Sequence, residues 1–157
     1  MTTKTHDWRS HSYVTAVSAA AGLAVSLAIV GSGGYVTRFL PATEIFIPAA
    51  IIGAALSGGL CAGVFGREGW AGNALSLIMA ILMTWIGSEL GAAIAAPFWR
   101  DVAMAGSSFG LGTTTLGLSA SEPFVLVTWI MSMASIHIFA KRVKHRARQE
   151  ARLVQTQ

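Results

Sequence analysis

Charge is what this sequence has least of. Its 157 residues include 11 basic and 7 acidic side chains, whereas 54% of them are hydrophobic. A water-soluble domain of this length needs more charge to cover its surface, so the composition excludes an ordinary soluble protein and favours the lipid bilayer as the surroundings. The length suits one domain. We therefore expect a single all-α integral membrane domain that comprises residues 1–157.

Cysteine and catalytic motifs are also scarce. Cys61 is the only cysteine, which excludes disulfide frameworks and paired-cysteine redox or zinc motifs. The sequence holds no HExxH pair, no glycine-rich phosphate loop after a strand, and no convergent set of Ser, His and Asp. We predict that the protein is not an enzyme and has no cofactor and no metal site.

Long windows without charge are abundant by contrast. A helix that crosses a bilayer needs about 20 mostly apolar residues. Four windows meet this requirement, with Glu89 as the one charge inside them: residues 13–36, 45–65, 73–96 and 123–140. The sequence therefore predicts a polytopic transmembrane bundle of four helices, followed by a basic, helical C-terminal tail over residues 141–157.

The segment 97–122 between the third and fourth windows has a different composition. Eleven of the twenty residues 102–121 are Gly, Ser or Thr, which is too polar for a typical span and too long for a typical connecting loop. A surface loop is the favoured interpretation, ahead of a re-entrant hairpin and of a fifth helix. All three stay open at this point.

Basic residues predict the orientation of the spans, because Lys and Arg gather on the cytoplasmic side. Four spans place nine of the eleven basic residues on the side of both termini, whereas a fifth span would move the N-terminus to the other side and divide the basic residues eight against three. We expect a bacterial inner-membrane protein with both termini in the cytoplasm. The tail is predicted to bind anionic lipid headgroups, and not nucleic acid, through Lys141, Arg142, Lys144, Arg146 and Arg148.

Small residues recur at intervals of three and four along the predicted helices. Residues at this spacing share one helical face, and small side chains let two backbones approach closely in lipid. This pattern predicts a tight group formed by the first three helices. The glycines predicted to pack there are Gly53, Gly59, Gly63, Gly87 and Gly91.

Glu89 is the sharpest functional candidate, because a carboxylate within a membrane helix is costly unless it is paired or neutral. At about 100° per residue, Glu89 points away from Gly87 and Gly91 and shares its side with Trp85. The acid is thus expected to face the fourth helix, another subunit or lipid. It either handles a proton or cation, or is a hydrogen-bonded residue that reaches the interface.

His137 is the second intramembrane candidate, one turn from the cytoplasmic end of the fourth helix. A haem ligand is one interpretation, and an interfacial histidine near Lys141 is the favoured one. Its depth differs from that of Glu89, so the two are not expected to pair within one subunit.

Two functions follow from these patterns. The leading hypothesis is a non-enzymatic accessory or scaffold subunit of a larger membrane complex, because catalytic groups are absent and Glu89 with Trp85 faces away from the small-residue stripe. The alternative is a small homo-oligomeric ion channel or transporter that uses Glu89.

Overall fold

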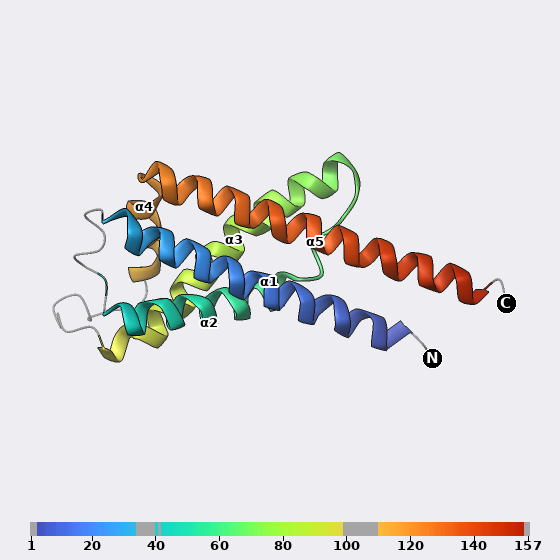
Figure 1. Cartoon of the computed structure of the whole chain (residues 1–157), viewed down its shortest axis with the longest axis horizontal. Helices are drawn as coiled ribbons and strands as arrows, with labels where there is room; N and C mark the ends of the chain where they lie inside the picture. The colour runs from blue at the N-terminus through green and yellow to red at the C-terminus, as the bar shows by residue number, and fades with distance from the viewer. Residues whose placement is uncertain (1–2, 34–39, 41, 99–109, 156–157) are drawn as a thin grey trace.

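The computed structural model describes residues 3–33, 40, 42–98 and 110–155. Within them the chain is all-helical (Figure 1), and the helices are α1 (Thr3–Ser32), α2 (Thr43–Cys61), α3 (Gly69–Ala95), the 3-10 turn η2 (Ala96–Phe98), α4 (Leu111–Ala120) and α5 (Pro123–Gln155). All of the α-helices except α4 are long and apolar enough to cross a membrane. This confirms the predicted number of four such helices.

The ends of the helices differ from the predicted windows for local reasons. Helix α1 begins at Thr3 instead of residue 13, and it stops at Ser32 because Gly33 adopts a left-handed conformation with φ +60°, which commonly ends helices. Helix α2 covers 43–61 instead of 45–65, and α3 covers 69–95 instead of 73–96. The turn that joins them contains Gly66 at φ +75°.

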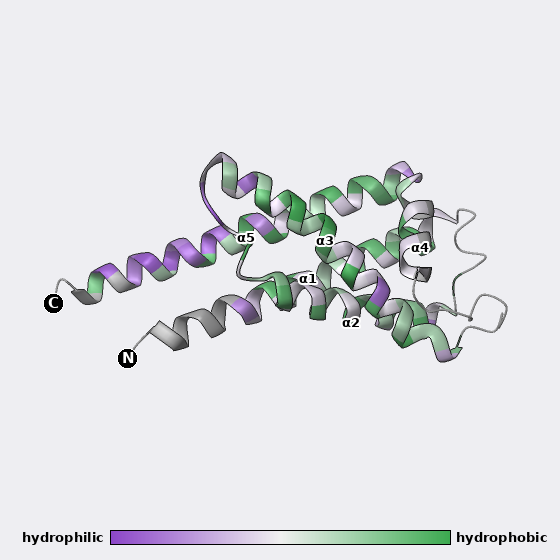
Figure 2. Cartoon of the chain, turned by 180° about the vertical axis from the view of Figure 1, so that it is seen from behind, coloured by the Kyte–Doolittle hydropathy of each residue, from purple (hydrophilic) through white to green (hydrophobic). Residues whose placement is uncertain are grey.

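Helix α5 is much longer than the predicted span over residues 123–140. Pro123 occupies its first turn, where the missing N–H costs nothing, and the amide of Leu126 donates to the carbonyl of Glu122 at 3.0 Å. Beyond Ala140 the sequence has no Gly or Pro to end the helix. The apolar span and the basic segment therefore form one helix of 33 residues, about 50 Å long, whose second half is mostly hydrophilic (Figure 2).

The helices form a ring in the order α5, α1, α2, α3, α4. Each packs on the next, and α4 returns to contact α5. Both termini lie at one end of the molecule, called the termini end below (Figure 1). Helix α4 runs across the opposite end, called the α4 end, in both Figure 1 and Figure 2. Part of the segment 97–122, favoured above as a surface loop, is thus a ten-residue helix that is too short to span a bilayer.

Two clusters of buried side chains hold the ring together. The larger one fills the termini end, where Phe65 and Ile136 have no exposed surface. Its other buried members are Val14, Ala21, Cys61, Ala62, Ala80, Met83 and Ala140. The smaller one joins α1 to α5 near the α4 end and contains Ala28, Ile29 and Val125.

Three of the five predicted packing glycines lie where α2 meets α3. A Cβ atom on Gly53 would collide with the carbonyl oxygen of Gly87, and one on Gly91 would lie 3.0 Å from the carbonyl oxygen of Ala49. Gly59 lies nearer the surface, where a Cβ atom would lie 3.1 Å from the hydroxyl of Thr15, and Gly63 has open space around it. Among these five glycines, the closest approach of two backbones is thus at the α2–α3 contact.

A further close contact between helices lies at a glycine that the sequence did not single out. A Cβ atom on Gly58 would collide with the side chain of Ser18 on α1. Ser18 is fully buried. Helix α1 thus packs on α2 through its serine and glycine face, and the alanines Ala16, Ala20 and Ala24 are exposed.

Candidate functional site

Glu89 of α3 binds the first turn of α4. One carboxylate oxygen, Oε2, accepts the amide N–H of Gly110 at 3.0 Å. The other, Oε1, accepts the amide N–H of Thr113 at 2.8 Å and the hydroxyl of the same residue at 2.6 Å. Both oxygens of the acid are therefore engaged by residues 110–113 of the same chain.

Trp85 takes part in the same contact. It lies one turn before Glu89 on α3, and its indole Nε1–H donates to the hydroxyl oxygen of Thr113 at 2.8 Å. The hydroxyl of Thr113 thus accepts from Trp85 and donates to Glu89. These two residues share a side of α3, as the sequence predicted, and α4 contacts that side, although Trp85 remains 40% exposed.

Glycines let α4 reach the backbone of α3 at this point. A Cβ atom on Gly112 would lie 2.6 Å from the amide nitrogen of Glu89, so a larger residue would push the helix away. Gly110 precedes α4 with φ +96°, a conformation that side chains with a Cβ atom rarely adopt. The local sequence Gly-Leu-Gly-Thr therefore brings three donors to one carboxylate.

The chemistry of this arrangement is that of a helix cap. The first amides of a helix have no partner within it, and a negative charge beside them is favourable because the helix dipole is positive there. Glu89 supplies both the acceptor and the charge, although it comes from a different helix. The sequence predicts that Glu89 faces the fourth span, which is α5, another subunit or lipid. Its partner in the structure is instead the short helix α4 of the same chain.

His137 lies at the termini end, away from Glu89. Its Nδ1 accepts the amide N–H of Gly66 at 3.4 Å, and its Nε2 lies 3.2 Å from Oδ1 of Asn73. Lys141 donates to the same oxygen of Asn73 at 3.0 Å. Both ring nitrogens are thus engaged by neighbouring groups, which fits an interfacial histidine better than an axial ligand.

Three of the five basic residues predicted to bind lipid headgroups contact the rest of the chain. Lys141 binds Asn73, as described above. Lys144 donates to the carbonyl oxygens of Gly63 and Phe65 in the α2–α3 turn. Arg148 forms an exposed ion pair with Glu68 at 2.9 Å.

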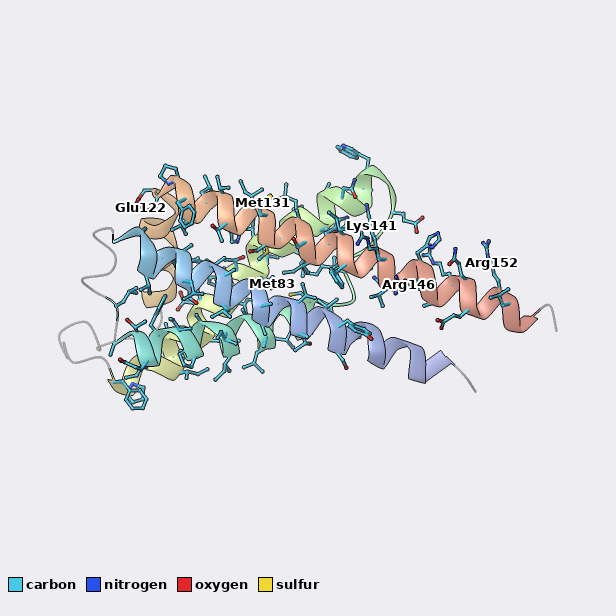
Figure 3. All side chains as sticks on the ribbon, viewed as in Figure 1. Met83, Glu122, Met131, Lys141, Arg146 and Arg152 are labelled. Atoms are coloured by element: carbon cyan, nitrogen blue, oxygen red, sulfur yellow. The ribbon has the colours of Figure 1, made fainter. Side chains whose placement is uncertain are left out.

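The other two, Arg142 and Arg146, are exposed and lie one turn apart. Figure 3 shows Arg146 and Arg152 on the part of α5 that extends beyond α2 and α3.

Sequence reasoning missed the residues that complete these contacts, namely Gly110, Gly112, Thr113 and Asn73. For the first three a signal existed, because Glu89 is the one acid in a predicted span and a Gly-Leu-Gly-Thr stretch begins 21 residues later. Among the residues that the structure describes, no group of three or more His, Cys, Asp or Glu side chains could hold a metal ion. Comparison of the chain with protein-family models, curated proteins and solved structures finds no match.

Proposed function

We propose that this chain is a non-enzymatic accessory or scaffold subunit of a larger membrane complex, with four spans and both termini on the cytoplasmic side of a bacterial inner membrane. The observation that carries the proposal is the helical extension of α5 beyond the other long helices. A single helix leaves the membrane-spanning part and continues to Gln155. It is suited to hold a partner at a fixed distance from the bilayer.

The base of this extension is fixed by the α2–α3 turn. Lys144 and Arg148 of α5 bind the carbonyls and Glu68 of the turn. A Cβ atom on Gly66 would lie 2.6 Å from the backbone of Ala140, so turn and helix are in direct backbone contact. Such a brace limits bending of α5 where it leaves the other helices, which is a property that a scaffold needs and a flexible tail lacks.

Arg142 and Arg146 are the exposed basic residues proposed to contact anionic groups. At 1.5 Å per residue, Arg142 lies close to the end of the apolar span and within reach of lipid headgroups, which attract basic residues near the surface. Arg146 lies about 6 Å farther along the helix axis. An acidic partner subunit that sits on the membrane surface would meet this second residue.

The alternative, a homo-oligomeric channel that uses Glu89, has less support. Both oxygens of Glu89 already accept hydrogen bonds from α4, and exchange of an ion would have to break them. The buried cluster around Phe65 and Ile136 fills the termini end of the chain, so a path through one subunit would be blocked there. A pore between subunits would need Glu89 to leave α4.

Native mass spectrometry of the protein, purified from its own membranes in mild detergent, tests the scaffold proposal. We expect masses that include foreign subunits. The double substitution Arg142→Glu with Arg146→Glu should release those subunits, while the control Arg67→Glu in the exposed α2–α3 turn should retain them. Masses that are only integer multiples of the chain's own mass would contradict the proposal and favour the channel.

A further inference from the structure

A cavity of about 120 Å³ lies inside the ring, toward the α4 end. All five α-helices contribute to its wall. On α1 the lining extends from Ser18 to Ile29, a distance of about 16 Å along the helix axis. The lining residues therefore extend along the spans, whereas the empty volume between them is small. The boundary of the cavity toward the termini end is the buried cluster described above. Met83 belongs both to that cluster and to the cavity wall, and it is labelled in Figure 3.

The wall of the cavity is apolar, even though serine and threonine occur in it. Ser26 and Ser57 donate their hydroxyl protons to carbonyls of their own helices, at 2.9 and 3.2 Å. Thr84 donates to the carbonyl of Ala80 and also accepts the indole N–H of Trp129. A buried water usually needs two to four polar partners, and hydroxyls engaged in this way offer few.

Helices α3 and α5 have little direct backbone contact, and α4 packs on both of them. Helices α3 and α5 are joined through side chains: Trp129 donates to Thr84 at 2.8 Å, and at the termini end His137 and Lys141 contact Asn73. Toward the α4 end the gap between them is bridged by α4, whose Gly112 and Leu116 line the cavity. The residues that line the cavity on α1, α2, α3 and α5 all belong to segments apolar enough to span the membrane. The cavity thus lies at the depth of lipid chains.

We propose that this cavity binds the end of one alkyl chain, which enters from the bilayer between α3 and α5. The depth and the apolar wall match the end of a hydrocarbon chain, and the volume of about 120 Å³ admits a short terminal part of it. The chain has two sources, the acyl chain of a membrane phospholipid or a free fatty acid. This inference is independent of the proposed scaffold role.

Photo-crosslinking with a diazirine on the alkyl chain tests the proposal. One probe is a fatty acid and the other is a phosphatidylcholine with the same labelled chain, each added in stoichiometric amount to the full-length protein in detergent. We expect crosslinks on the cavity residues Met83 and Met133, in excess over the outward-facing Ile81, which is 56% exposed. Cavity crosslinks from the phospholipid identify a membrane lipid as the source, and cavity crosslinks from the fatty acid alone identify the free acid.

A pair of neighbouring alanines on α3 provides matched variants. Ala92 is buried and lines the cavity, whereas Ala93 is exposed and lies outside it. Ala92→Leu should fill part of the cavity and reduce the labelling of Met83 at least several-fold, and Ala93→Leu should leave it unchanged. The proposal would be overturned if both probes label the unaltered protein on Ile81 but not on Met83 and Met133. This outcome does not depend on whether the Ala92 variant folds.

Discussion

Replacement of Glu89 by alanine should release α4 while the four long helices stay folded. The substitution removes the acceptor of three hydrogen bonds, from the amides of Gly110 and Thr113 and from the hydroxyl of Thr113. Loss of a helix cap costs about 0.5–2 kcal/mol, and hydrogen bonds to charged groups contribute about 1.5–3 kcal/mol. Because water or lipid headgroups can replace part of these hydrogen bonds at the half-buried Glu89, we expect the α4 contact to lose about 2 kcal/mol of stability.

Glu89→Gln should have a smaller effect. Glutamine keeps one acceptor oxygen at nearly the same position, but it loses the charge and the second oxygen. We expect a loss of about 1 kcal/mol, because a neutral hydrogen bond has roughly half the strength of one to an ionised group. A larger loss of stability in Glu89→Ala than in Glu89→Gln therefore tests the contact, and the loss in Glu89→Gln tests the role of the charge.

Hydrogen–deuterium exchange measures the effect at α4 itself. A loss of about 2 kcal/mol corresponds to roughly 30-fold faster exchange of the α4 amides, and about 1 kcal/mol to roughly five-fold. Exchange in α1 and α2 should stay as it is. Glu44→Ala, which removes an exposed acid from the first turn of α2, is the control and should leave α4 protected.

A double-mutant cycle with Thr113→Val then isolates the pair. Thr113→Val alone removes the hydroxyl that joins Trp85 to Glu89 and should cost about 1 kcal/mol. Added to Glu89→Ala it should cost much less, because contacting residues are not additive. Unchanged exchange of α4 in Glu89→Ala, or an equal rise throughout the protein, would refute the assignment of Glu89 as the cap of α4.

Three further outcomes are expected. Gly53→Ala should lower the free energy of unfolding in detergent by about 1–3 kcal/mol, since overpacking at the α2–α3 contact forces the helices apart. The control Gly63→Ala should be nearly neutral, because Gly63 has open space around it. Equal effects of the two substitutions would contradict the assigned helix faces. Gly66→Ala should loosen the α2–α3 turn from α5, because the added Cβ atom clashes with the α5 backbone and alanine is strained at the positive φ of this position. We expect faster proteolysis of the turn, and unchanged proteolysis would contradict the brace. Reporter fusions after Trp8 and after Gln157 should both read cytoplasmic by the excess of basic residues on that side, and an extracytoplasmic result at either terminus would contradict four spans.

The four long helices could be predicted from sequence because absence of charge over about 20 residues is a strong signal in a bilayer. Their ends were harder to place, since they depend on single backbone conformations such as the left-handed Gly33. The extension of α5 was partly foreseen as a helical tail. Its brace was not, because the α2–α3 turn lies about 80 residues away in sequence from its ion-pair partner.

Helix α4 shows where sequence reasoning reaches its limit. Ten residues rich in Gly, Ser and Thr form a marginal helix on their own, so composition favoured a loop. The helix exists in the folded chain because Glu89 satisfies its first amides and because Gly112 allows it to rest on the backbone of α3. Both causes are tertiary, and pattern and propensity along the chain do not reveal them.

Ion flux into liposomes that contain the purified protein tests most directly whether Glu89 is a structural cap. The account predicts that the unaltered protein and Glu89→Gln conduct protons and monovalent cations no faster than protein-free liposomes do. Flux in the unaltered protein that Glu89→Gln abolishes, with α4 still protected from exchange, would contradict the account and assign the carboxylate to ion transport.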